Sequence, residues 1–122
     1  MTIAKGNSLT RDERIRREAD YERVYARRCT VRDEILQICA CENGLAHSRV
    51  GLSVGRRWGK ANVRNRLRRL FREAFRLSKQ RLPTGLDLVL IPRRSVTTLP
   101  DLMKSLPDLA GEAAKRLQKK PR

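Results

Sequence analysis

Arg49-Val-Gly-Leu-Ser-Val-Gly-Arg-Arg-Trp-Gly-Lys-Ala-Asn-Val-Arg-Asn-Arg-Leu-Arg-Arg-Leu-Phe-Arg-Glu-Ala-Phe75 is the stretch that decides the fold of this 122-residue chain. Its first six residues alternate between apolar and other side chains, which predicts a half-buried strand. Gly55 and Gly59 then mark a loop. From about Ala61 to Arg81 apolar residues recur every three or four positions, which predicts a long amphipathic helix. The stretch therefore predicts a strand, a basic loop and a helix.

Four further elements are expected on either side of this stretch, each from its apolar spacing. They are a helix at Asp12–Arg28, strands at Ile35–Cys41 and Leu86–Ile91, and a helix at Leu99–Lys119. A turn around Asn43-Gly44 predicts that the first of these strands forms a hairpin with Arg49–Val54. We expect Pro107 to kink or divide the last helix, because proline lacks the backbone N–H that a helix interior needs.

The charge of the chain is strongly positive. It has 29 Lys and Arg against 13 Asp and Glu, a formal charge of +16, which is more than solubility requires. Residues 49–81 hold twelve of the basic residues and a single acid, Glu73. Since 39% of the residues are apolar, we expect one packed domain over residues 1–122, with loose ends at 1–10 and 119–122. The charge therefore predicts a polyanionic partner.

Helical geometry divides the long basic segment into two faces. At about 100° per residue one stripe is apolar: Val63, Leu67, Leu70, Phe71, Ala74 and Leu77. The opposite side is basic around Asn65: Arg68, Arg72, Arg76 and Lys79. A solvated face would normally mix signs. Lys60, Arg64 and Arg66 moreover lie at the helix N-terminus, where the macrodipole disfavours each cation by ~0.3–1 kcal/mol unless a phosphate binds there. We therefore interpret this face as a phosphate-binding surface.

The remaining features exclude other classes of protein. No apolar run approaches the ~20 residues that span a bilayer, and the start of the chain lacks the apolar core of a signal peptide, so we expect a cytoplasmic protein without a membrane partner. The three cysteines, two of them in a strand, are expected to be free thiols. A structural zinc site is the alternative, but His47 and Cys29 do not complete a known ligand spacing.

RNA is favoured over DNA as the partner. The sequence contains no zinc-finger spacing, basic zipper or clear helix-turn-helix, and folded RNA is recognised by shape and phosphate. A metal nuclease would need convergent carboxylates or a histidine base. The acids here are scattered, and His47 lies in an expected turn. We therefore expect no catalytic residue, metal site or cofactor on the protein.

The quoted stretch resembles the protein component of bacterial ribonuclease P. The likeness rests on the strand, the glycine-bounded basic loop, Arg64-Asn65-Arg66 and the apolar spacing as far as Phe75, and it extends to Arg14–Tyr25 and Gly85–Arg93. The resemblance implies a single small α+β domain in the order α-β-β-β-α-β-α, with a central sheet packed by helices, as in the second domain of the fifth small-subunit ribosomal protein. It also implies a left-handed strand-helix-strand crossover, against the usual preference.

The function that the resemblance implies is removal of the 5′ leader from precursor tRNA. The RNA subunit performs the hydrolysis with Mg²⁺, and the protein is its non-catalytic subunit. The residues implied to bind that RNA are Arg56, Arg57, Lys60, Arg64, Asn65, Arg66, Arg68, Arg69 and Arg72. The residues implied to line a cleft for the leader are Tyr21, Tyr25, Thr30, Val31, Leu36, Cys39 and Ser53.

Three points stay open from the sequence. Cys39 takes a sheet position that is often aromatic in the family, so one stacking platform is missing from the cleft. Tyr21 and Tyr25, four residues apart on one helical face, could instead be core residues. A ribosomal protein or general RNA chaperone is the alternative function, because the same charge would serve it.

Overall fold

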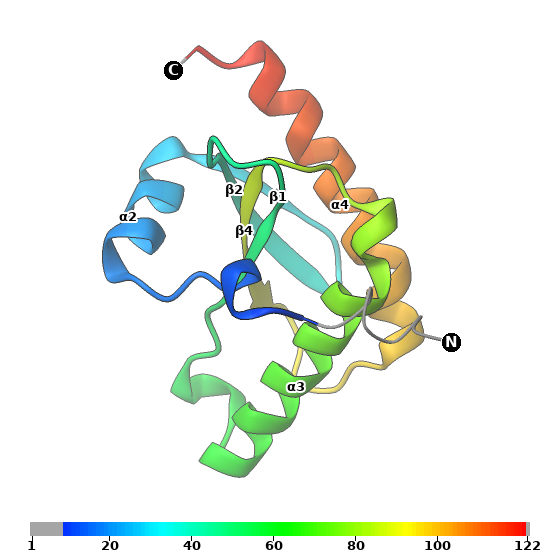
Figure 1. Ribbon diagram of the computed structural model, residues 1–122. Coiled ribbons are helices and arrows are strands. Elements are labelled where there is room, and N and C mark those ends of the chain that lie inside the picture. The colour runs from blue at the N-terminus through cyan, green and yellow to red at the C-terminus, as the bar shows by residue number, and fades with distance from the viewer. Residues whose placement is uncertain (1–8, 122) are drawn as a thin grey trace.

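The computed structural model describes residues 9–121, in which three helices and four strands follow the expected order α-β-β-β-α-β-α (Figure 1). The helices are α2 (Glu18–Arg27), α3 (Ala61–Ser78) and α4 (Leu99–Lys119). The strands are β1 (Cys29–Arg32), β2 (Leu36–Glu42), β3 (Arg49–Leu52) and β4 (Leu86–Pro92). Short 3₁₀ helices occupy Arg11–Glu13, Arg56–Trp58 and Lys79–Arg81.

The four strands form one mixed sheet in the order β1-β2-β4-β3. Strands β1 and β2, and β2 and β4, are antiparallel, whereas β3 and β4 are parallel and are joined through α3. The hairpin expected between β2 and β3 is therefore wrong, because β4 lies between them. The hairpin partner of β2 is β1, whose four residues are too short to show an apolar period. The left-handed sense of the β3-α3-β4 crossover stays a prediction.

The two faces of the sheet carry separate apolar clusters. Figure 1 shows α2 on one side of the strands and α3 and α4 on the other. The larger cluster lies under α3 and α4, and its largest buried side chains are Phe71, Phe75, Leu36, Ile38, Leu88 and Leu90. The smaller cluster lies under α2 and consists of Ile15, Val24, Cys39, Cys41 and Val89, with Tyr21 and Ile91 against it. Phe71 and Phe75 are thus core residues, as their spacing predicts.

The first helix is shorter than the sequence predicts. It begins at Glu18. Before it, Arg11–Glu13 form a 3₁₀ helix, and the chain then runs extended along β3, where the backbone N–H of Ile15 donates to the carbonyl of Val50 at 2.8 Å. Arg14 forms an isolated parallel bridge with the same residue. The segment that was expected to be the first turn of the helix therefore extends the sheet at the β3 edge.

The last helix has the expected bounds, but Pro107 does not divide it. A proline leaves the carbonyl four residues earlier, here Met103, without its helical hydrogen bond. In this structure the guanidinium of Arg81 donates to that carbonyl at 3.1 Å. The helix therefore continues through the proline with its freed carbonyl satisfied from a neighbouring element.

Both ends of the described chain make hydrogen bonds. Arg27 donates to the carbonyls of Lys120 at 2.8 Å and Pro121 at 2.7 Å, and Thr10 shares hydrogen bonds with Glu13. The loose ends expected at residues 1–10 and 119–122 stay a prediction. The rest of the two expected tails, residues 1–8 and 122, lies outside the described residues.

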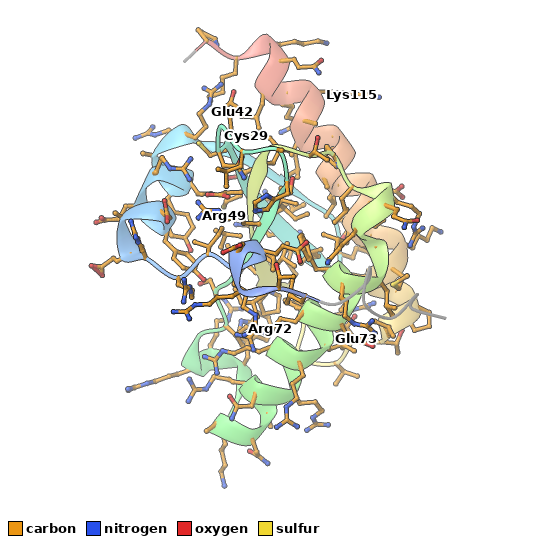
Figure 2. All side chains as sticks on the ribbon, in the orientation of Figure 1. Cys29, Glu42, Arg49, Arg72, Glu73 and Lys115 are labelled. Carbon is orange, nitrogen blue, oxygen red and sulfur yellow. The ribbon has the colours of Figure 1, made fainter. Side chains whose placement is uncertain are left out.

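A buried carboxylate joins α2 to the sheet. Asp87 in β4 is fully buried and accepts two hydrogen bonds from Arg49 in β3, at 2.8 and 2.6 Å. Arg23 of α2 donates to the same carboxylate, as does the amide of Asn43 at 3.0 Å. Asp20 on α2 adds a contact to Arg49 at 3.5 Å. Figure 2 shows Arg49 between α2 and the strands, where it connects the two layers.

The partners of Asp87 decide its protonation. Burial alone would raise the pKa of this carboxyl, but the hydrogen bonds from Arg49 and Asn43 and the charges of Arg49 and Arg23 outweigh it, so the pKa is lowered. A lowered folded-state pKa contributes stability that is complete above the unfolded value of about 3.9. That contribution is lost as the pH falls through the folded-state value.

We predict that Asp87→Asn lowers the free energy of unfolding by about 3 kcal/mol at pH 7, because it leaves two arginines beside a buried neutral group. Urea denaturation measures the loss. As the pH is lowered below about 4, the wild type should lose stability more steeply than the variant, since only the wild type has this carboxylate to protonate.

The matched control is Glu112→Gln, which breaks the exposed pair with Arg116 on α4. Exposed pairs of this kind contribute under about 1 kcal/mol. Equal losses of stability for the two variants would show that the Asp87 cluster does not hold the layers together.

Candidate nucleic-acid interface

The outer side of α3 carries a basic surface that we call the α3 face. It consists of Arg64, Asn65, Arg66 and Arg69, together with Arg56, Arg57 and Lys60 from the preceding loop. All of these side chains are exposed except Arg64, which is half-buried. Leu67, Phe71, Ala74 and Phe75 hold the helix against the core from the other side. The helix is therefore anchored by one stripe and leaves its arginines available to a partner.

The α3 face has little acid to neutralise it. Glu73 is the single acid on α3, and Arg76 occupies it with hydrogen bonds of 2.9 and 2.6 Å. This pairing lowers the pKa of Glu73, chiefly through the hydrogen bond from Arg76. Arg64 Nε is shielded from solvent and has no hydrogen-bond partner among the described residues. The unneutralised guanidinium groups are suited to bidentate contacts with phosphate oxygens.

The N-terminal end of α3 has the polarity of an anion site. Its N-cap is Lys60, which makes no side-chain capping bond, and its first turn contains no acid. In the loop before it, the guanidinium of Arg57 lies 4.6 Å from the ring centre of Trp58, a cation–π arrangement that keeps this arginine beside the helix. The backbone N–H groups and the loop cations thus point to the same kind of ligand.

Three basic side chains, two on α3 and one at Lys79 in the 3₁₀ helix after it, are not on the solvated side that helical winding predicts. Lys79 pairs with Glu13 at 2.8 Å, and Arg68 and Arg72 face the extended segment around Arg14. The physical reason is that this segment packs along α3, which the helical period of α3 alone cannot show. In Figure 2 Arg72 and Glu73 leave α3 on different sides.

A second feature is a groove between α2 and the end of β3. It has a volume of about 520 Å³ and is lined by Arg16, Glu18, Tyr21, Glu22, Tyr25, Leu52 and Ser53. Tyr25 is 43% exposed, so its ring is available to a ligand. Tyr21 is half-buried against the smaller apolar cluster. The structure therefore divides the two tyrosines: Tyr25 is open to the groove, and Tyr21 is partly core.

The hydroxyl of Tyr21 is fixed by the sheet. The backbone N–H of Leu52 donates to it at 3.1 Å, and it lies 3.5 Å from the carbonyls of Ile15 and Leu52. Gly51 leaves room for this ring, since a Cβ at that position would be 2.8 Å from the hydroxyl oxygen. The glycine of β3 thus serves the placement of Tyr21.

The other expected cleft residues separate by sheet face. Thr30 and Cys39 are paired neighbours on the α2 side, with Oγ1 and Sγ 3.6 Å apart. Val31 and Leu36 are buried on the opposite face, in the larger cluster, so the expectation that they line the cleft is wrong. They differ from Thr30 and Cys39 by an odd number of residues along their strands, and alternate residues face opposite sides.

Three residues that the sequence does not single out share the α2 face with Thr30. The register aligns Arg32 with Gln37, and Gln37 with Ile91. Arg32 is exposed, and the other two are half-buried. The signal that could have found them is the parity of each strand: Gln37 has the same parity as Cys39, and Arg32 the same as Thr30.

The groups of this chain that could bind a metal include three cysteines. Cys29, Cys39 and Cys41 are free and buried, as expected, and burial raises the pKa of the Cys29 and Cys41 thiols. Within residues 9–121 no three His, Cys, Asp or Glu side chains gather as metal ligands. No helix in the same range is long and apolar enough to cross a membrane.

The known proteins that this chain resembles in sequence and in structure come from one family. The family model of Ribonuclease P matches residues 9–114, which include α2, α3 and all four strands. The Ribonuclease P protein component of Thermotoga petrophila is 40% identical over 90 residues, 74% of this chain and 77% of that protein. The RNase P protein from Thermotoga maritima has a TM-score of 0.75 at 32% identity, covering 82% of this chain and 96% of its own. The Staphylococcus aureus RNase P protein has a TM-score of 0.72 at 29% identity, covering 83% of this chain and 94% of its own.

We predict that Gly51→Ala displaces the ring of Tyr21 and lowers the free energy of unfolding by about 1–3 kcal/mol, the usual cost of overpacking. Urea denaturation followed by circular dichroism measures this loss. Gly55→Ala is the matched control, because a Cβ there would meet nothing within 4 Å. If both variants are as stable as the wild type, Gly51 is not needed for the placement of Tyr21.

Proposed function

This chain belongs to the Ribonuclease P protein family, and from that membership we propose how it acts: the α3 face binds the RNA subunit, and the groove beside α2 holds the 5′ leader of precursor tRNA. Members of this family are the RNA-binding protein subunits of ribonuclease P, which acts in tRNA processing. We further propose that the RNA subunit performs the hydrolysis with Mg²⁺, and that the protein contributes binding.

The observation that carries this proposal is the α3 face itself. Its arginines and Lys60 surround a helix N-terminus without an acidic cap, and Glu73, the single acid of α3, is already paired with Arg76. Such a surface is costly for an isolated protein, because like charges repel and the macrodipole disfavours cations at this end. A folded RNA removes both costs, since its backbone presents phosphates at close spacing.

The groove supports a second, single-strand function. An exposed aromatic ring such as that of Tyr25 can stack on an unpaired base regardless of its sequence. The groove lies beside α2, whereas α3 packs on the opposite face of the sheet. A general RNA chaperone needs only the first surface, so the presence of both favours a subunit that holds two RNA segments.

The acids of the chain support a binding role. Asp87, Glu73, Glu13 and Asp33 all have a lowered pKa from hydrogen bonds to basic groups, backbone N–H groups or hydroxyls. They are ionised and engaged at neutral pH, which suits them to hold the fold rather than to exchange protons. The ring nitrogen Nε2 of His47 lies 3.1 Å from the carbonyl of Asp12, in a loop contact.

The test of this proposal is cleavage of precursor tRNA by the cognate RNA subunit, with and without the protein. We predict stimulation by the wild type, and weaker binding of the RNA subunit by Arg66→Ala. One lost charge-assisted contact costs about 1.5–3 kcal/mol and lowers the slope of log affinity against log salt by about one. Filter binding at several salt concentrations measures both.

The matched control for Arg66→Ala is Lys115→Ala. Lys115 is an exposed cation on α4, at the end of the molecule away from the start of α3 (Figure 2). The Lys115→Ala substitution removes one positive charge, as Arg66→Ala does, but leaves the α3 face unchanged. No stimulation of cleavage by the wild type would overturn the proposed function. Equal salt slopes for the two variants would show that the α3 face is ordinary solvent-exposed surface.

We predict a different effect for Tyr25→Leu, which keeps apolar volume but removes the exposed ring. The reconstituted holoenzyme should lose about 1–3 kcal/mol of affinity for precursor tRNA with a leader, the value of one stacked base. Affinity for mature tRNA and for the RNA subunit should be unchanged. Equal losses for precursor and mature tRNA would place the defect outside the groove.

A further inference from the structure

Three arginines from two distant segments meet beside Tyr21. Arg14 comes from the extended segment before α2, and Arg68 and Arg72 are one turn apart on α3. With Tyr21 and Gly51 they line a cavity of about 170 Å³. We call these three side chains the arginine triad.

The fold builds the arginine triad through backbone contacts. The N–H of Ile15 is bonded to the carbonyl of Val50, which fixes the neighbouring Arg14 at the edge of β3. On α3, burial of Phe71 places the adjacent Arg72 at the border between core and solvent, where it is half-buried. The triad is therefore held by the sheet and a packed helix.

No acid compensates this concentration of charge. The cavity is lined by Arg14, Arg16, Arg68, Arg72 and neutral residues, and no ion pair of Arg14 or Arg72 is found within residues 9–121. Arg68 donates to the neutral side chain of Asn65 at 2.9 Å. The pKa of Arg72 is lowered, first by burial and then by the charges of Arg14 and Arg68. Each of these features disfavours the empty site and favours an anion in it.

The triad cavity and the groove adjoin. Both are lined by Arg16, Tyr21 and Leu52. Glu18, Glu22 and the exposed Tyr25 line the groove but not the triad cavity, so we take them as the acidic end of the groove, away from the triad. A phosphate is repelled at that acidic end and attracted at the triad, whereas an uncharged base is compatible with the acidic end. The charges thus favour one orientation of a bound strand, with a phosphate at the triad and a base at the acidic end.

We propose that the arginine triad binds one phosphate of a single-stranded leader whose neighbouring base lies at Tyr25. Arg68 and Arg72 are then substrate-binding residues rather than part of the surface for the RNA subunit, and Arg14 joins them. The identity of the strand rests on the proposed function. A phosphate of the RNA subunit has the same chemistry, so the experiment includes an arm for each source.

The experiment uses the reconstituted holoenzyme and precursor tRNAs in which single leader phosphates are replaced by uncharged methylphosphonates. In the wild type we expect one leader position at which the replacement weakens binding by about tenfold. In Arg72→Gln the affinity for unmodified precursor should fall by a similar factor, and the replacement at that position should have no further effect. This loss of additivity is the signature of a direct contact.

The matched variant is Arg69→Gln, an exposed neighbour on α3 that does not line the cavity. It should weaken binding of the RNA subunit while the methylphosphonate effect in the assembled holoenzyme keeps its full size. Arg72→Gln should show the reverse, with normal affinity for the RNA subunit and for mature tRNA.

A melting curve controls for folding. Because Arg72 faces like charges, Arg72→Gln should melt at or above the temperature of the wild type, and Arg72→Lys should restore part of the affinity if the contact is to a phosphate. Additive effects at every leader position, or a loss confined to binding of the RNA subunit, would overturn the proposal. Failure of the proposed function is a separate result, in which the wild-type protein does not stimulate cleavage at all.

Discussion

The buried carboxylate of Asp87 is the interaction on which the other features depend. It is the point where three segments meet, since Arg49 comes from β3, Arg23 from α2 and Asn43 from the loop between β2 and β3. Apart from this carboxylate, α2 is held to the sheet by a small apolar cluster, by the pair of Arg27 with Glu42 and by the hydroxyl of Tyr21. The groove exists because α2 is fixed at this distance from β3, so an electrostatic contact in the interior determines a binding surface outside.

The position of β4 explains how one small sheet supports two surfaces. It pairs with β2 on one side and β3 on the other, and its alternating residues serve both clusters. Leu88 and Leu90 face α3 and α4, and the apolar stripe of α3 packs against this cluster. The opposite side of α3 makes no contact with the core and can therefore be basic. Asp87 and Val89 face α2 and support the groove. The two sets of residues face opposite sides because successive side chains of a strand alternate between the two faces of the sheet.

The sequence predicts the local features of this fold well and the long-range ones poorly. The bounds of α4 and the apolar stripe of α3 follow from the helical period, which is a property of neighbouring residues. The insertion of β4 between β2 and β3 does not, because strand pairing is decided by contacts far apart in the chain. The same limit affects the site: Tyr25 was expected in the cleft and lines the groove, but Val31 and Leu36 were assigned to it without the register that places them on the other face.

The unpaired arginines connect stability to assembly. Within the described residues Arg64, Arg66, Arg69 and Arg72 have no acidic partner, so their mutual repulsion lowers the stability of the protein alone. A ligand that binds only the folded state adds stability in proportion to its affinity and concentration. Phosphates bound at the α3 face and the triad would therefore stabilise the fold, because they offset the repulsion between the arginines. The fold in turn would favour phosphate binding, because it holds the guanidinium groups in place. Charge that is unfavourable in the isolated chain would then favour binding to RNA, as the proposed function requires.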